Sequence, residues 1–246
     1  MSGWPGVNWV WLAAVDSTNA MAERLQEAWL ADAEAVLPPT LICADTQWAG
    51  RGRHGRSWQS PRGGLYASFV SWVGVEALPW LPLAAGVAVL LGVRRLLPSL
   101  GRVLKWPNDL EVEQRKLGGV LCSSRIQGDR AWAVAGFGVN VLGAPALPGD
   151  PRQATSLAQL GFGGTLEEAR EAILETFVTQ FPVLLANPES LRRTWLAASI
   201  HGPGDRLRLK TTTGPVEGQF LGLSRQGMLE LRAGDRIISL ASGEVE

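Results

Sequence analysis

The sequence predicts an α+β fold: a mixed β-sheet with flanking helices over residues 1–198, followed by a small β-barrel over residues 199–246. Two patterns support this prediction. Up to Ala198, apolar β-rich runs alternate with segments of helical character. Beyond Ser199, short strands alternate with turns that contain glycine or proline, which is typical of a small barrel. Of the 246 residues 46% are hydrophobic, so the chain can bury a sizeable core.

The first elements are expected to be a strand at Asn8–Val15 and a helix that begins at Ser17 or Thr18, whose hydroxyl can cap it. Two further strands flank a glycine-rich segment, with Leu41–Ala44 before it and Leu65–Val73 after it.

The segment Leu78–Leu97 is apolar enough to raise the question of a membrane span. Its uncharged part, residues 77–93, is at the short limit of the roughly 17–25 residues that a span needs. Proline and glycine residues interrupt the segment, and two arginines close it. We therefore expect a buried core helix.

The sequence from Arg102 to Ala198 predicts three β-rich runs and two helices. The runs are Arg102–Trp106, Leu117–Arg125 and Ala131–Val141, the last two joined by a turn at residues 127–129. Thr165 and Glu168 have the spacing of a capping box for a helix at 166–185, and Pro188 begins a second helix that ends near Ala198.

Composition limits the function classes. The formal net charge is zero, so no global field attracts the chain to nucleic acid or membrane. Cys43 and Cys122 lack metal-site spacing and read as reduced thiols of a cytoplasmic protein. The N-terminus shows no signal peptide.

The segment Asp45–Ser60 is the most informative part of the chain. It combines three closely spaced glycines with three arginines, which are Arg51, Arg53 and Arg56. Glycines let a backbone close over a ligand, and guanidinium groups bind phosphate or carboxylate. The segment also resembles a dinucleotide-binding or phosphate-binding glycine loop, but no helix follows it, so we reject both interpretations. We therefore favour a loop that covers an anionic ligand over a solvated arginine-rich turn, and we call residues 45–60 the arginine loop.

A second polar segment contains two of the chain's three lysines, Lys105 and Lys116. Because the chain otherwise uses 20 arginines, these lysines suggest a need for compact point charges, although ordinary strand-edge charges would explain them too. Asn108 and Asp109 read either as a plain turn or, for Asp109, as a candidate Mg²⁺ ligand beside phosphates. Lys210, in the small barrel, is expected to lie away from this chemistry.

Several motifs together resemble the biotin protein ligases over nearly the whole chain. They are Ser17-Thr18-Asn19, residues 47–58, residues 105–109, residues 116–119, residues 136–141 and residues 242–245. The resemblance implies a class II synthetase-like catalytic domain with a small SH3-like C-terminal domain. It also implies that ATP and biotin form biotinyl-5′-AMP with Mg²⁺, and that the biotinyl group then passes to a lysine of a biotin carboxyl carrier protein.

The resemblance further implies residue roles. The catalytic residues would be Lys116 and Arg53. The biotin-binding residues would be Ser17, Thr18, Asn19, Gln47, Gly50, Arg51, Gly52, Arg53, Lys116 and Gly119. The adenylate-binding residues would be Arg51, Arg53, Arg56, Trp58, Lys105, Asn108 and Asn140. Residues 144–153 are expected to close over the adenine.

The chain departs from the family pattern in two places. Only 16 residues precede Ser17, so we expect no operator-binding domain and no repressor activity. Where the family often has an acidic residue after residues 119–121, this chain has Cys122-Ser123-Ser124. A lipoate–protein ligase and a non-enzymatic nucleic-acid binder are the alternatives, and neither suits the arginine loop together with zero net charge. The protein is expected to be a monomer or a homodimer.

Overall fold

The computed structural model describes residues 6–30, 38–146 and 153–246. Within these ranges seven strands form one mixed sheet in the order β1-β2-β3-β7-β6-β5-β4. Their bounds are β1 Asn8–Leu12, β2 Thr40–Ala44, β3 Gly64–Gly74, β4 Leu104–Lys105, β5 Asp109–Val112, β6 Arg115–Gln127 and β7 Arg130–Asn140. Strands β1 and β2 are parallel, and the remaining neighbours are antiparallel.

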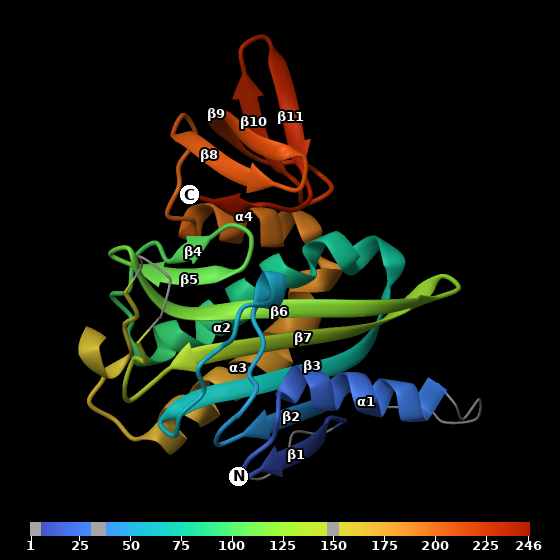
Figure 1. Ribbon diagram of the computed structural model, residues 1–246, viewed down its shortest axis with the longest axis vertical. Coiled ribbons are helices and arrows are strands. Elements are labelled where there is room, and N and C mark those ends of the chain that lie inside the picture. The colour runs from blue at the N-terminus through green and yellow to red at the C-terminus, as the bar shows by residue number, and fades with distance from the viewer. Residues whose placement is uncertain (1–5, 31–37, 147–152) are drawn as a thin grey trace.

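Helices cover both faces of this sheet (Figure 1). Helix α1 (Thr18–Leu30) lies on one face, and α2 (Leu81–Leu96) and α3 (Leu166–Ala186) lie on the other. Because side chains alternate along a strand, the side chains of adjacent β2 residues lie on opposite faces of the sheet. Ile42 packs in the small cluster with Ala22 of α1, and Leu41 belongs to the main core.

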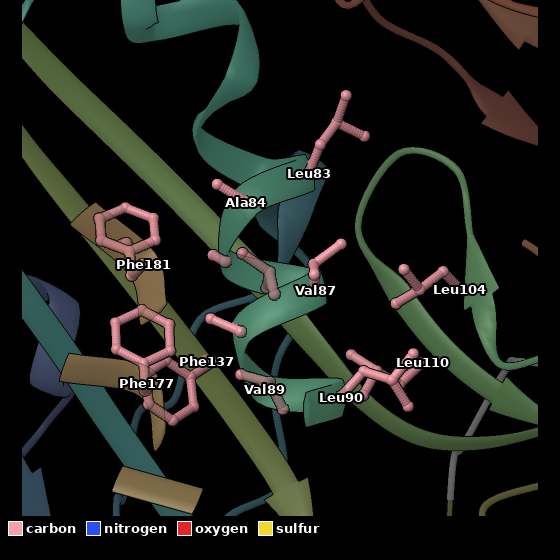
Figure 2. Packing of buried hydrophobic residues seen from close by; sticks show 14 of the residues in the cluster. Leu83, Ala84, Val87, Val89, Leu90, Leu104, Leu110, Phe137, Phe177 and Phe181 are labelled. Carbon is pink, nitrogen blue, oxygen red and sulfur yellow. The ribbon is translucent and has the colours of Figure 1, made fainter. Parts of the chain in front are cut away.

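The main core lies between the sheet and the helix pair α2–α3 (Figure 2). Phe177 of α3 is fully buried and stacks on Phe137 of β7 with ring centroids 4.4 Å apart. Phe181, one turn later, stacks on Phe177 at 5.0 Å. These aromatic rings fix α3 against the centre of the sheet, because large buried side chains contribute most to core packing.

The segment expected to form a buried helix does so. Residues Val75–Leu96 are long and apolar enough to cross a membrane by length and composition, but 61% of the most apolar window is buried inside the protein. A 3-10 turn at Val75–Trp80 precedes α2, and Leu83, Val87 and Leu90 of α2 point into the core in Figure 2.

Local signals fix the boundaries of the last two helices. Thr165 accepts a hydrogen bond from the Glu168 backbone, and Glu168 accepts one from the Thr165 backbone, so the predicted capping box is present. Helix α4 spans Pro188–Ala198, as predicted. The chain then forms a parallel bridge between Ser199 and Leu104 before it leaves the first sheet.

Five further strands of the described chain form a second, antiparallel sheet in the order β11-β10-β9-β8-β12. Their bounds are β8 Arg206–Thr211, β9 Gly214–Leu223, β10 Leu229–Ala233, β11 Arg236–Leu240 and β12 Glu244–Val245. This small unit sits on α4 at one end of the first sheet (Figure 1). The predicted α+β fold, with a mixed sheet followed by a small all-β unit, is confirmed.

Two predicted elements differ from the structure. Strand β1 ends at Leu12, and Val15 forms only an isolated bridge with Gln47. Asp109–Val112 forms strand β5 rather than a plain turn, since it pairs with both β4 and β6. The turn comes before it, at residues 106–108.

Candidate active site

A pocket of about 1300 Å³ opens between α1, the arginine loop, the strands β5–β6–β7 and the C-terminal strand β12. Most of the predicted site residues line it. They are Ser17, Thr18, Asn19, Gln47, Arg51, Gly52, Arg53, Arg56, Trp58, Lys105, Asn108, Asp109, Lys116 and Gly119.

The floor of the pocket results from a change in side-chain size along β3 and β7. Trp72 lies opposite Trp132, with the two rings stacked 4.6 Å apart. Two positions further along that face Val70 lies opposite Val134, and then Ser68 lies opposite Gly136. The Trp and Val pairs pack against α1, and at the smallest pair the Asn19 side chain lies over Gly136, so that Asn19 and Gly136 both line the pocket.

The glycines of β7 are sterically required. A Cβ added at Gly136 would overlap the side chain of Asn19, and one added at Gly138 would lie 2.5 Å from Nε1 of Trp58. Sequence reasoning quoted these glycines in a motif but did not assign them to the site. Alternating glycines in a buried strand are a signal of close approach that could have found them.

An uncharged polar corner forms one end of the pocket. Oε1 of Gln47 accepts hydrogen bonds from the backbone N–H and the hydroxyl of Thr18, at 2.8 and 3.2 Å, and Gln47 donates to Ser60 at 2.7 Å. Asn19 donates to the Leu121 carbonyl and accepts from Ser68. Because these groups are mutually bonded, the corner is pre-organised for a neutral polar ligand.

The arginine loop covers the pocket without forming a helix, as expected. Its centre is a short 3-10 turn at Arg53–Gly55, in which His54 has a φ of 56°. Two backbone bonds close its base, from Gly52 N–H to the Arg56 carbonyl at 2.7 Å and from Trp58 N–H to the Gly50 carbonyl at 2.8 Å. Gly50 does not line the main pocket; it borders a smaller cavity of about 550 Å³ behind the loop.

The three arginines of the loop contact two sides of the pocket. Arg51 pairs with Glu23 of α1 at 3.1 Å. Arg53 donates to Asn108 at 3.2 Å and to the Gly243 carbonyl at 3.0 Å, and Arg56 pairs with Glu244 at 2.7 Å. Burial lowers the pKa of Arg53, and the nearby carboxylates of Asp109 and Glu244 oppose that effect.

Lys116 lines the same pocket as the polar corner and the loop arginines. Its Nζ lies 2.8 Å from Oδ1 of Asp109 and 5.4 Å from the centroid of the Trp58 ring. Only 15% of the Lys116 side chain and 12% of the Asp109 side chain are exposed. A largely buried ammonium held in one place can stabilise negative charge that develops on a bound ligand.

The far end of the pocket includes the predicted residue Lys105 together with residues that sequence reasoning missed. Lys105 pairs with Glu111 at 3.4 Å, and His201 lines the same region. Nε2 of His201 is buried without a hydrogen-bond partner among the described residues, and burial followed by the charge of Lys105 lowers the pKa of its imidazole. Lys210 and Glu244 of the second sheet also line the pocket. The expectation that Lys210 lies away from the site is therefore wrong.

Asn140 does not line the pocket. Its buried side chain donates to the backbone carbonyls of Thr155, at 2.9 Å, and Lys116, at 3.3 Å. In this arrangement Asn140 supports the strand segment that carries Lys116 instead of facing an adenylate. Of the segment 144–153, expected to close over adenine, residues 147–152 lie outside the described part of the chain.

The surroundings of Asp109 do not fit a resident Mg²⁺ ion. Oδ1 of Asp109 is engaged by the Lys116 ammonium, and no group of three or more His, Cys, Asp or Glu residues in the described chain could hold a metal. Mg²⁺ is typically bound by carboxylates together with substrate phosphates and water. The predicted role of Asp109 as a metal ligand is not supported by this donor set.

Comparison with known proteins agrees with this architecture. Residues 12–140 match the biotin/lipoate A/B protein ligase family, and residues 204–246 match the biotin protein ligase C-terminal domain. The chain is 35% identical over 257 aligned positions to biotin–[acetyl-CoA-carboxylase] ligase of Mycobacterium tuberculosis, covering 99% of this chain and 90% of that one. It is 31% identical over 216 positions to the bifunctional ligase/repressor BirA of Bacillus subtilis, covering 84% of this chain but 66% of that one. The solved structure of biotin protein ligase from Aquifex aeolicus in complex with biotin and ATP superposes with a TM-score of 0.76, at 28% identity and 97% coverage of both chains.

The fold, together with the family matches over both sheets, defines a protein ligase of the biotin/lipoate class. The chain belongs to the biotin/lipoate A/B protein ligase family, and the match of its C-terminal sheet places it among the biotin protein ligases.

Proposed function

We propose that this chain activates biotin with ATP as biotinyl-5′-AMP and transfers the biotinyl group to a lysine of a biotin carboxyl carrier protein. The observation that carries the proposal is the position of Lys116. Its ammonium lies in the same pocket that Gln47 and the arginine loop line, 5.4 Å from the centroid of the Trp58 ring.

The polar corner suits the ureido ring of biotin, which offers two N–H donors and one carbonyl acceptor. Ser17, Thr18 and Asn19 reach the pocket from the start of α1, and Gln47 reaches it from the loop. No side chain of this corner carries a charge, so the corner favours a neutral ring. The biotin carboxylate would instead bind the positively charged side chains of Lys116 and the loop arginines.

In the first step a carboxylate oxygen of biotin attacks the α-phosphorus of ATP, and the bond to the pyrophosphate oxygen breaks. Two anions approach and negative charge builds on the α-phosphoryl oxygens. Lys116 and Arg53 are positioned to stabilise that charge, because Lys116 is largely buried, Arg53 is half-buried, and both are held by protein partners. Arg56, Lys105 and Lys210 add positive charge where the leaving pyrophosphate would lie.

In the second step the neutral amine of the acceptor lysine attacks the acyl carbon and AMP leaves. Lys116 can stay on the acyl oxygen in this step too, since a tetrahedral oxyanion forms at the same carbon. The loop would exclude water and so protect the mixed anhydride from hydrolysis.

Mg²⁺ enters this proposal as the partner of ATP. It would neutralise part of the triphosphate charge, and no described group of protein ligands is assigned to it. We further propose that residues 1–198 form the catalytic domain and residues 199–246 the C-terminal domain. We also propose a cytoplasmic location, because Cys43 and Cys122 are both free thiols in the structure.

Biotin-dependent exchange of labelled pyrophosphate into ATP tests the proposal. We expect exchange only when biotin, ATP and Mg²⁺ are all present, and we expect lipoate not to replace biotin. The proposal fails if exchange proceeds with lipoate and not with biotin, or if no carrier domain becomes biotinylated by protein that supports exchange.

A further inference from the structure

Glu23 occupies a position where three elements meet. It follows Asn19 by one turn of α1, so both residues lie on the same side of the helix. Its Oε2 lies 3.1 Å from Arg51 of the loop, and its Oε1 accepts a hydrogen bond of 3.2 Å from the hydroxyl of Ser123 on β6. One carboxylate therefore connects α1, the loop and the sheet.

This contact holds the loop from a side that the other arginines do not reach. In the described structure Arg53 contacts Asn108 and Gly243, and Arg56 contacts Glu244, so both hold the loop toward β5 and β12. The Arg51–Glu23 pair holds it toward α1, next to the polar corner. The smaller cavity of about 550 Å³ lies at this contact and leaves the loop little apolar packing there.

The pair is too exposed to contribute much to global stability. The Arg51 side chain is 54% exposed and that of Glu23 is 38% exposed. Exposed pairs typically change an equilibrium by a factor of about two to five. In a loop rich in glycine, however, a factor of that size is enough to change how often the loop is closed.

We propose that Glu23 is a positioning residue that holds Arg51, and with it the arginine loop, over the α1 side of the pocket. Glu23 does not touch the reacting atoms in this proposal. It acts through Arg51, and the consequence for ligand binding rests on the biotin ligase function proposed above. The consequence for the loop itself does not.

The neighbouring hydroxyl makes a rescue experiment possible. Because Ser123 lies within hydrogen-bond distance of Glu23, a carboxylate placed at residue 123 starts on the same side of the sheet as Arg51. Glu23→Gln removes the charge, and the double variant Glu23→Gln with Ser123→Glu restores a carboxylate from the strand. Glu27→Gln is the matched control, since Glu27 lies one turn further along α1 and is exposed.

Two measurements on the full chain test the proposal. The first is the rate of trypsin cleavage at Arg51, Arg53 and Arg56 without ligand, compared at equal thermal stability. We expect about two- to fivefold faster cleavage for Glu23→Gln, no change for Glu27→Gln, and recovery in the double variant. The difference should also shrink in 1 M salt, where charges are screened within about 3 Å.

The second measurement is the equilibrium dissociation constant for biotin, which should rise for Glu23→Gln and recover in the double variant. The proposal is overturned if Glu23→Gln and Glu27→Gln are cleaved at the same rate, or if Ser123→Glu fails to restore protection. If the unmodified chain does not bind biotin at all, the proposed function fails, and the cleavage rates still decide the role of Glu23.

Discussion

Nζ of Lys116 lies 2.8 Å from Oδ1 of Asp109, and both side chains are largely buried. The carboxylate keeps the ammonium inside the pocket before any ligand arrives. A ligand carboxylate that enters beside Trp58 would approach a cation that is already oriented and largely dehydrated. This is the arrangement in which a single charge contributes most to a reaction.

Lys116→Ala should slow adenylate formation by at least about 10²-fold, the usual scale for one pre-organised electrostatic group. Biotin affinity should fall as well, because the same ammonium would pair with the free carboxylate. Lys116→Arg should restore only part of the rate, since a planar guanidinium cannot occupy the same point. Pyrophosphate exchange measures the rate for both variants.

The control for this series is Arg236→Ala, an exposed position on β11 that does not line the pocket. Lys210 cannot serve as a control, because it lines the pocket. A wild-type exchange rate in Lys116→Ala would remove Lys116 from the catalytic role.

Removal of the floor glycine Gly138 should impair binding more than folding. A Cβ at residue 138 would meet the Trp58 indole at 2.5 Å, and Trp58 sits on a loop that can move aside. Gly138→Ala should therefore raise the KM for biotin or ATP by about tenfold, which corresponds to about 1.4 kcal/mol. Gly163→Ala, which meets nothing within 4 Å, is the control. Equal KM values for the two variants would contradict the steric argument.

His201 should make folding stability depend on pH on the acid side. Its pKa is lowered in the folded protein, mainly by burial, so the unfolded chain takes up the proton more readily. The stability that it contributes is fully present above the unfolded pKa of about 6.5 and is lost as the pH falls below it. Melting temperatures between pH 7.5 and 5 should fall more steeply for the wild type than for His201→Asn. Parallel curves would show that the imidazole is not the responsible group.

Mg²⁺ should not bind the protein without nucleotide. Asp109 already pairs with Lys116. The described chain contains no cluster of three or more His, Cys, Asp or Glu residues that could hold a metal ion. Calorimetric titration of Mg²⁺ should therefore give no saturable heat until ATP is added. Saturable binding to the ligand-free protein that disappears in Asp109→Asn would restore the metal role of Asp109.

The arginine loop should become protected when ligand binds. Its glycines keep backbone entropy high, and its contacts are exposed polar pairs that a bound anion can reinforce. Trypsin should cleave at Arg53 more slowly with biotin, and slowest with biotin and ATP together. Unchanged cleavage in all three conditions would show that the loop does not respond to the site.

Features set by local sequence could be predicted, and features set by distant contacts could not. The capping box of Thr165 and Glu168 depends on residues three positions apart, and it was found. Strand β5 was missed because four residues after a proline-containing turn carry almost no periodicity, and only pairing with β4 and β6 defines it. The contribution of Glu244 to the pocket was missed because its partner Arg56 is 188 positions away.

The contacts of Gly243 and Glu244 with the arginine loop have a consequence for biosynthesis. The seven-stranded sheet, its helices and the loop are all made before residue 199, whereas the partners of Arg53 and Arg56 on β12 leave the ribosome about 45 residues later. A nascent chain can therefore fold its first sheet while that side of the pocket is still open. The contacts of Arg53 with Gly243 and of Arg56 with Glu244 can form only after those last residues have left the ribosome. Ribosomes that stall within the second sheet would therefore carry a folded first sheet whose arginine loop lacks these two contacts.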